Sequence, residues 1–345
     1  MTDKIITEKS GDIARIIFNQ PEKRNAVSLE MWQAVEAALD EYAEDPEMRI
    51  LILSGAGGKA FVSGADISKF ESERASEEAV ANYNATTKRV YDKLEGFPKP
   101  TIAQIDGFCI GGGVALALSC DMRICGAGSN FAVPAAKLGL GYGYIGIKRL
   151  VNVVGPSFAK EIFFTARRFD AEEARVMGLV NRVVEDGKVA ETAEDTAKMI
   201  AANAPMTVGS VKFIVGETVK DESAADLEEC DRRVKACFDS KDFQVAIATS
   251  GTLEKSRAAL TAAGIPYSRM VYVNGDDVIH KKPNPELFLI AAKRMGLAPQ
   301  RCVVIEDAPN GVEAAKAAGA LCIAVTNTTP SAQLAKADRI TDSLA

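Results

Sequence analysis

Three consecutive glycines, Gly111 to Gly113, lie between an apolar strand-like run and an apolar helix-like run. Glycine permits close backbone approach and lets amide N–H groups turn outward. The first N–H groups of a helix lack partners within the helix, and the helix dipole places positive potential there. Such amides can stabilise an oxyanion as it develops during a reaction. The glycines could equally serve a tight strand-to-helix turn, so this motif by itself leaves a catalytic and a structural role open.

A second segment, Lys59–Ile67 (KAFVSGADI), makes the glycines part of a larger pattern. Together with Asp106–Gly113 (DGFCIGGG), it resembles the crotonase, or enoyl-CoA hydratase/isomerase, family, whose two motifs have the forms AF-x-x-GADI and G-x-x-x-GGG. The resemblance covers about residues 1–243. It implies an acyl-CoA thioester as ligand and a thioester enolate as the species to be stabilised. The amides of Ser63 and Gly112 match the oxyanion-hole donors of the family.

The resemblance also implies where CoA binds, as part of the substrate and with no separate cofactor. The CoA moiety would lie along Lys23, Arg24 and Ala26, with its adenine near Ala65–Ile67. Lys23 and Arg24 carry the positive charge that suits a phosphate-rich ligand, although such residues also occur in solvated turns. Asp66 is expected to shape the loop rather than act as an acid. The matched CoA-binding positions are Lys23, Arg24, Ala26, Ala60, Gly64, Ala65, Asp66, Ile67 and Gly111.

Two positions depart from the hydratase pattern of the family. Hydration needs two placed carboxyl groups, one to activate water and one to handle the proton on the α-carbon. In hydratases that resemble this chain, the first carboxyl group follows the three glycines by two positions, where this chain has Ala115. The second follows the proline of the next loop, where this chain has Ala135. Ordinary hydration is therefore not expected, and a non-catalytic CoA-binding protein is one alternative.

A decarboxylase is another alternative. The segment Leu138–Ile147, predicted as a loop, resembles the corresponding loop of methylmalonyl-CoA decarboxylases in the same family, where a tyrosine orients the substrate carboxylate. The match to that tyrosine is Tyr142, the third catalytic candidate, whereas the histidine of those enzymes falls on Ala65. Decarboxylation needs little beyond an oxyanion hole and a dry pocket. Tyr142 could instead be a packing residue whose hydroxyl group bonds to backbone.

A different pattern begins near Gln244. Thr249-Ser250, Lys282 and Glu306-Asp307 follow one another in the order of three motifs of haloacid-dehalogenase-superfamily phosphatases, and resemble the β-phosphoglucomutase-like members. In that family the hydroxyl group and the lysine hold phosphate, and the acidic pair holds Mg²⁺ through hard oxygen ligands. The first motif, which supplies the aspartyl nucleophile, is missing. The tail is therefore expected to be inactive and to hold no functional metal, with a Mg²⁺-dependent phosphatase as the remaining alternative.

The two sets of motifs fall in two predicted domains, a crotonase-like domain over residues 1–243 and an incomplete haloacid-dehalogenase-like domain over 244–345. No Pro/Gly/Ser-rich linker separates them, and a natural recombination and an engineered fusion both fit so abrupt a junction. Alternating strand-like and helix-like runs indicate an α/β fold class. The resemblance implies a crotonase superhelix of ββα units whose helical region, Pro156–Lys241, builds homotrimers or hexamers. A partial Rossmann-like parallel sheet follows. Strands are predicted at residues 13–19, 49–54, 100–107, 122–126, 131–133, 245–249, 270–273, 302–305 and 321–325.

The composition excludes several other classes of protein. The formal net charge of −6 leaves no basic excess with which to neutralise a nucleic-acid backbone. Seven cysteines without CxxC pairs and a single histidine, His280, argue against structural zinc and against a disulfide framework. No apolar run reaches the ~18 residues of a membrane span, and the polar segment Met1–Gly11 does not resemble a secretory signal. The expected location is the cytoplasm.

Overall fold

The computed structural model of the chain describes residues 2–69, 75–239, 244–265, 267 and 270–343. Two compact units, Met1–Cys237 and Phe238–Ala345, divide the chain and are described separately. The domain boundary expected between residues 243 and 244 borders the stretch 240–243, which lies outside the described residues.

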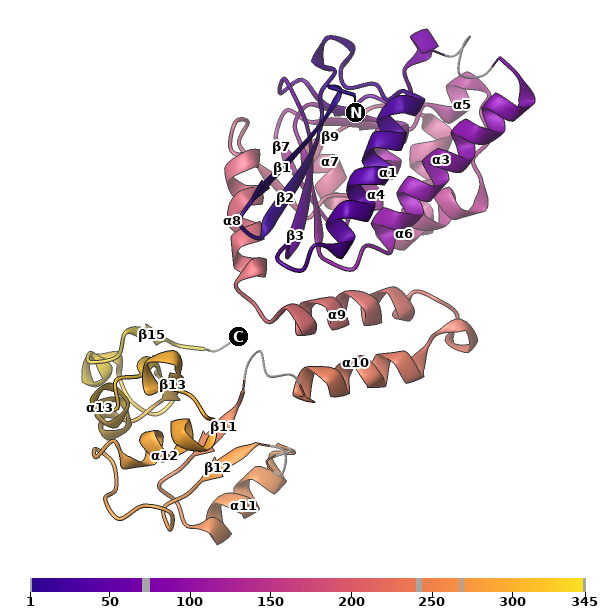
Figure 1. The fold of residues 1–345 in the computed structure, drawn as a ribbon. Coiled ribbons are helices and arrows are strands. Elements are labelled where there is room, and N and C mark those ends of the chain that lie inside the picture. The colour runs from indigo at the N-terminus through magenta and orange to yellow at the C-terminus, as the bar shows by residue number, and fades with distance from the viewer. Residues whose placement is uncertain (1, 70–74, 240–243, 266, 268–269, 344–345) are drawn as a thin grey trace. The chain divides into compact units, whose positions relative to one another are not determined.

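The first unit is built on a six-stranded sheet with the order β1-β2-β3-β5-β7-β10 (Figure 1). β1 and β2 pair antiparallel, and the other neighbouring strands pair parallel. β3 is buried over nearly its whole length, as is usual for a parallel strand covered on both faces. The strands are β1 Ile5–Ser10, β2 Ile13–Phe18, β3 Ile50–Gly55, β5 Thr101–Ile105, β7 Met122–Gly126 and β10 Arg182–Val184.

A smaller sheet with the order β4-β6-β8-β9 holds the segments that carry the predicted site. Its strands are β4 Ala60–Val62, β6 Phe108–Ile110, β8 Asn130–Ala132 and β9 Phe169–Asp170. Three times, a strand of the large sheet leads to a strand of the small sheet and then to a helix. This repetition is the ββα superhelix predicted from the sequence, and it confirms the α/β fold class.

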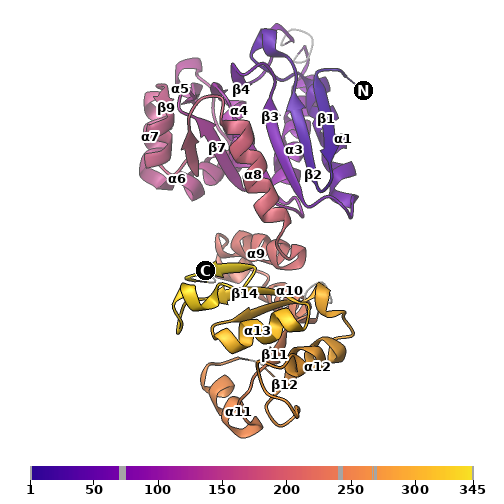
Figure 2. The ribbon, with the colours of Figure 1, turned by 90° about the vertical axis from the view of Figure 1, so that its left-hand side faces the viewer.

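Helices cover both faces of the large sheet. One face carries α8, whose Val189, Ala193 and Ala197 pack on isoleucines of the strands (Figure 2). The other face carries the larger core, to which α1 contributes Trp32 and Val35 at helical spacing. The helices are α1 Leu29–Glu44, α3 Glu77–Glu95, α4 Gly112–Leu118, α5 Ala135–Leu138, α6 Tyr144–Thr165, α7 Ala171–Val176, α8 Val189–Ala201, α9 Pro205–Thr218 and α10 Leu227–Asp239.

One local expectation was wrong. The predicted loop 138–147 is helical from Tyr144 onward, because α6 starts there. That helix is broken at Gly155, which has a φ of 73° and is followed by Pro156. The region expected to be mainly helical is so among its described residues, and it also contains the short strands β9 and β10. β10 pairs with β7 and β9 with β8, so these strands owe their conformation to partners distant in sequence.

The second unit contains short parallel strands with helices between them, as predicted. They form two sheets, β11-β12 and β13-β14-β15. Among the described residues no single helix is long and apolar enough to span a membrane. The helices α8 and α9 are long and apolar enough only when taken together, and they are bent by 107° relative to each other. The elements are β11 Ala246–Ala248, α11 Leu253–Ala262, β12 Val271–Val273, α12 Glu286–Arg294, β13 Val303–Glu306, α13 Pro309–Ala317, β14 Leu321–Val325 and β15 Arg339–Thr341.

Candidate active site

The two motif segments lie against each other at the ends of β4 and β6, which pair parallel. A β-carbon placed on Gly113 would lie 2.0 Å from the Val62 carbonyl oxygen, so only glycine fits at this position. A β-carbon on Gly112 would lie 3.8 Å from the Gly64 α-carbon. The fold therefore brings the Ser63–Gly64 segment next to the first turn of α4, where Gly112 is the first residue.

Gly111 makes the turn from β6 into α4. It has φ 55° and ψ −110°, which side-chain-bearing residues rarely adopt, and its N–H donates to the Ala132 carbonyl oxygen at 2.8 Å. The next amide along the chain, that of Gly112, has no partner within the helix by its position in the first turn. A free amide at this position is one of the two donors that an oxyanion site would need.

A cavity of about 640 Å³ opens beside this turn. Tyr142 lines it and packs edge-on against Phe163, with ring centroids 4.9 Å apart. Burial raises the pKa of the Tyr142 phenol, so its hydroxyl group remains a hydrogen-bond donor at neutral pH. The lining residues are Tyr83, Asn84, Thr87, Lys88, Tyr91, Gly111, Gly112, Val114, Ala115, Leu118, Val133, Leu140, Gly141, Tyr142, Gly143, Tyr144, Ile145, Gly146, Arg149, Leu150 and Phe163.

Carboxyl groups are absent from this lining among the described residues. Ala115, at the position of the first hydratase carboxyl group, faces the cavity with a methyl group. Ala135, at the second, is buried with 4% of its surface exposed and does not line the cavity. The cavity thus offers hydroxyl groups, backbone amides, the Asn84 side chain and the cationic side chains of Lys88 and Arg149, but no carboxylate base among the described residues.

Sequence analysis missed Tyr91 and Arg149 as parts of this site. The buried Tyr91 hydroxyl group donates to the Gly112 carbonyl oxygen at 3.2 Å and so holds the start of α4 in place. Arg149 is 8% exposed and forms ion pairs with Asp92 at 2.8 Å and Glu95 at 2.7 Å. One available signal was the spacing of Tyr83, Thr87 and Tyr91, four residues apart along α3, which places them on one helix face.

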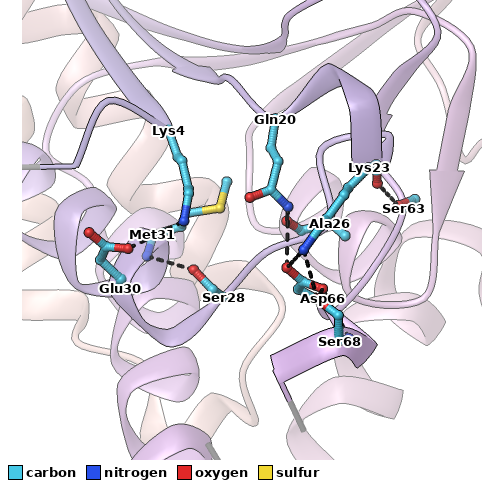
Figure 3. Close-up of polar contacts among 10 residues, drawn as sticks. All are labelled: Lys4, Gln20, Lys23, Ala26, Ser28, Glu30, Met31, Ser63, Asp66 and Ser68. Atoms are coloured by element: carbon cyan, nitrogen blue, oxygen red, sulfur yellow. Dashed lines mark hydrogen bonds and ion pairs between the residues drawn. The ribbon is translucent and has the colours of Figure 1, made fainter. Parts of the chain in front are cut away.

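Near Ser63, a buried polar cluster surrounds Asp66 (Figure 3). The Asp66 carboxylate accepts hydrogen bonds from Lys23 Nζ at 2.9 Å, Gln20 Nε2 at 3.3 Å and Ser68 Oγ at 2.6 Å. Ser63 Oγ donates to the Lys23 carbonyl oxygen at 3.3 Å. Burial of Asp66 opposes ionisation, but the hydrogen bonds from Ser68, Lys23 and Gln20 outweigh it and lower the Asp66 pKa to about 2. The Asp66 carboxylate therefore links Ser68 to Gln20 and Lys23, and the positive charge of Lys23 is paired within the protein.

The Asp66 cluster should stabilise the first unit above about pH 4 and lose that contribution as the pH falls toward 2. The folded carboxyl group has a pKa of about 2 and an unfolded one about 3.9, so the unfolded state binds more protons in this window. The difference corresponds to about 2 kcal/mol. Denaturation followed by fluorescence of the single tryptophan, Trp32, should show Asp66→Asn less stable than wild type at pH 6, with the gap closing toward pH 2. A gap that is the same at both pH values would contradict this.

The other CoA-binding candidates differ in exposure. Ile67 is 76% exposed, whereas Ala60 is 1% exposed. The Ala60 carbonyl oxygen accepts from Asn25 Nδ2 at 2.7 Å, and Asn25 was missed by sequence analysis. Ala26 is 9% exposed, and Ala65 forms an isolated parallel bridge with Val27. The exposed Ile67 side chain is therefore accessible to a ligand, whereas Ala60 is buried and supports the loop through its hydrogen bond with Asn25.

Two guanidinium groups lie against the ring of Phe108. Arg24 lies 5.0 Å and Arg168 5.4 Å from the centroid of the Phe108 ring. Neither arginine forms an ion pair among the described residues. Because cations over an aromatic face are held in place while their charge stays available, this pair is suited to a phosphate group. Arg168 could not be identified from sequence because only the fold brings it beside Arg24.

In the tail, Lys282 and Glu306 form a close ion pair with each other. The Asp307 carboxylate accepts from Thr328 Oγ1 at 2.8 Å, and Thr249 Oγ1 accepts from the Gly251 N–H at 3.1 Å. No group of three potential metal ligands occurs among the described residues. Lys282 therefore offsets the charge of Glu306, one of the two expected Mg²⁺ ligands, and Ser250 follows Thr249 in the same loop.

The sequence matches the enoyl-CoA hydratase/isomerase family over residues 8–260. The chain belongs to this family. It is 34% identical to the short-chain enoyl-CoA hydratase of Clostridium acetobutylicum over 260 residues, which are 75% of this chain and 94% of that protein. It is 32% identical to the carnitinyl-CoA dehydratase of Salmonella typhi, over 63% of this chain and 82% of that protein.

A solved enoyl-CoA hydratase from Bacillus anthracis superposes on this crotonase fold with a TM-score of 0.66 and 28% identity, covering 76% of this chain and 97% of that one. The family match runs past the first unit into β11 and α11. Residues 279–345 match a second family, the HAD-hydrolase-like proteins. The predicted joining of an enoyl-CoA hydratase/isomerase-family region to a haloacid-dehalogenase-like tail is thus confirmed.

Proposed function

We propose that the chain binds a malonyl-type acyl-CoA thioester and decarboxylates it through a thioester enolate. One observation carries the proposal: among the described residues, the cavity beside Gly112 is lined by tyrosine hydroxyl groups and no carboxyl group. When the bond between the α-carbon and the carboxylate breaks, CO₂ leaves. The electron pair of that bond stays with the substrate and forms the enolate. No base is needed for that step, whereas hydration and α-proton abstraction both require one.

Each candidate residue has a role in this reaction. The amides of Ser63 and Gly112 would hold the thioester oxygen, which becomes negative as the enolate forms. The Tyr142 hydroxyl group would donate to the substrate carboxylate and orient it. Arg24 and Arg168 would bind phosphate groups of CoA, since both side chains keep their charge available beside Phe108.

The names of several relatives point to hydration, but two residues of this chain speak against it. Ala115 and Ala135 stand where the family resemblance places the two hydratase carboxyl groups. A methyl group transfers no proton. Non-catalytic binding of acyl-CoA is therefore the second candidate, and the same two alanines support it. Phosphatase activity of the tail is not favoured, because Lys282 and Glu306 satisfy each other.

The proposed assembly is a homotrimer or a hexamer of two trimers. Apolar side chains on α9 and α10 support an oligomer, since Val215 is 57%, Leu227 59% and Phe238 56% exposed. Exposed apolar groups gathered on two helices are typical of protein–protein contacts.

Mass spectrometry of crotonyl-, 3-hydroxybutyryl-, malonyl- and methylmalonyl-CoA, each incubated with the protein, tests the proposed reaction. Loss of CO₂ from a malonyl-type thioester is the expected result. Tyr142→Phe should reduce that rate about tenfold or more, because a hydrogen bond to a charged group is lost. Tyr144→Phe is the matched control, as this residue also lines the cavity but is 75% exposed. Water added to crotonyl-CoA would refute the proposal, and CoA binding without turnover would favour the second candidate.

A further inference from the structure

The second unit contains two sheets whose facing strands each have an open edge. β11 pairs only with β12, and β13 pairs only with β14, among the described residues. The strand edges that face away from these partners keep backbone N–H and C=O groups without a strand partner. Such groups are obligatory hydrogen-bonding groups and form a template for a further strand.

An apolar cavity of about 620 Å³ lies between β11 and β13. Its floor comes from α12 and the residues around α13, so one set of helices backs both sheets. Ala248 of β11 packs against the same buried cluster as Val304 of β13. We call this cavity the strand slot. Its lining residues are Gln244, Val245, Ala246, Ala248, Phe288, Ala291, Ala292, Met295, Leu297, Pro299, Arg301, Cys302, Val303, Val304, Ile305, Ala318 and Ala320.

Large apolar side chains at the strand slot are unusually exposed. Val245 is 58%, Val303 54% and Ile305 55% exposed. Parallel strands are normally buried on both faces and read as continuous apolar runs. The composition of β13 is therefore that of a central strand, while its exposure is that of an edge strand. A further strand in the slot would cover these groups.

The charge at the slot indicates which residues an inserted strand would carry. Arg301 is its one charged lining residue and forms no ion pair among the described residues. It immediately precedes β13 and so marks the end of the slot at which the strand begins. An acidic residue at the start of an inserted strand would pair with Arg301, and uncharged β-branched residues would follow it along the slot.

We propose that the strand slot binds an extended β-strand from another polypeptide, with an acidic residue first and four or five apolar residues after it. We assign the inserted strand the direction of β13, so that its first, acidic residue lies at the Arg301 end of the slot. It would form hydrogen bonds on both of its edges, as in β-strand addition. A second copy of this chain is a poor donor, since each described strand is already paired within a sheet.

Fluorescence anisotropy with the full chain tests the proposal. The probe is a fluorescein-labelled peptide of one aspartate followed by alternating valine and isoleucine, with a polar solubilising tail. Saturable binding is expected. Ile305→Asp should weaken it at least about tenfold, because a charge then lies in the apolar slot. Leu321→Asp is the matched control: Leu321 is 53% exposed on the neighbouring β14 and does not line the slot, so this variant should bind as wild type does.

The peptide supplies its own controls. N-methylation of alternate residues removes the N–H groups that face one flanking strand and should weaken binding, and replacing the aspartate with lysine should do the same through Arg301. Absence of saturable binding, or equal binding by wild type and Ile305→Asp, would overturn the proposal. Self-association in sedimentation velocity that Ile305→Asp abolishes would also overturn it, in favour of a second copy as occupant.

Discussion

Replacing Gly112 with proline should lower kcat for decarboxylation of a malonyl-type CoA thioester by about 10²–10³-fold, the usual loss on removal of one oxyanion-hole donor. Proline has no N–H, so the enolate oxygen loses one of its two proposed partners. The fold should tolerate the change, because Gly112 is the first residue of α4 and proline is favoured at that position. Product formation by mass spectrometry and near-ultraviolet circular dichroism would measure the two effects separately.

Gly112→Ala is the matched control for this experiment. It keeps the N–H, and its β-carbon would lie 3.4 Å from Tyr91 Oη and 3.8 Å from the Gly64 α-carbon, distances that require little movement. The alanine variant should therefore retain most of the wild-type rate. A proline variant that folds normally and turns over like the alanine variant would remove the Gly112 amide from the mechanism. Binding of free CoA should be similar in all three proteins, because Gly112 itself is not among the proposed CoA-binding residues.

Placing a carboxyl group at position 115 should create an activity that the wild-type protein lacks. Ala115→Glu puts a potential base on the cavity wall, one turn into α4 from the proposed oxyanion hole. A well-placed general base contributes about 10²–10⁴-fold to proton transfer. We therefore expect this variant to exchange the α-protons of butyryl-CoA with D₂O at least about a hundredfold faster than wild type. Deuterium incorporation by mass spectrometry is the measurement.

Ala115→Gln separates basicity from shape in this second experiment. Glutamine has nearly the size of glutamate and cannot accept the proton, so it should exchange no faster than wild type. Rapid exchange by the wild-type protein itself would contradict the proposed absence of a base. Exchange by neither variant, with CoA binding intact, would mean that position 115 does not face the α-carbon.

The ββα repeat was implied by the family resemblance, and the longer parallel strands of the large sheet also carry their own signal. Ile50–Gly55 and Thr101–Ile105 are apolar runs that require burial on both faces, and α1 shows helical spacing after the cap Ser28. β10 carries no such signal, because Arg182 and its two valines are only partly covered and become a strand by pairing with β7. The start of α6 was missed because Gly143 and Gly146 flank Tyr144 and resemble loop residues.

The residues of the candidate site also fall into those that the sequence indicated and those that it did not. Close backbone contact restricts Gly113 to glycine, and positive φ values favour glycine at Gly64 and Gly111. Ser63 and Gly112 were identified through the family resemblance of their segments. Tyr91 and Asn25 act on backbone groups of distant segments, Gly112 and Ala60. The four-residue spacing in α3 marks Tyr91 as part of one helix face, but local sequence does not reveal the remote partner of either side chain. Lys23 remains a predicted CoA-binding residue: the fold pairs it with Asp66, and its side chain is 40% exposed.

By itself, the sequence determined the fold class, the joining of two families and the two backbone segments of the proposed oxyanion hole. The fold class depends on apolar periodicity, whereas the two families and the oxyanion-hole segments were identified from short motifs that resemble those of known families. At Gly113 the motif also has a steric cause, because a side chain there would collide with a neighbouring backbone. Only the tertiary structure decided that Ala115 faces a cavity free of described carboxyl groups, that Arg24 and Arg168 flank Phe108, and that β11 and β13 leave a slot between them. Those properties depend on which residues meet across space, and burial and charge at such meeting points follow from packing rather than from local sequence.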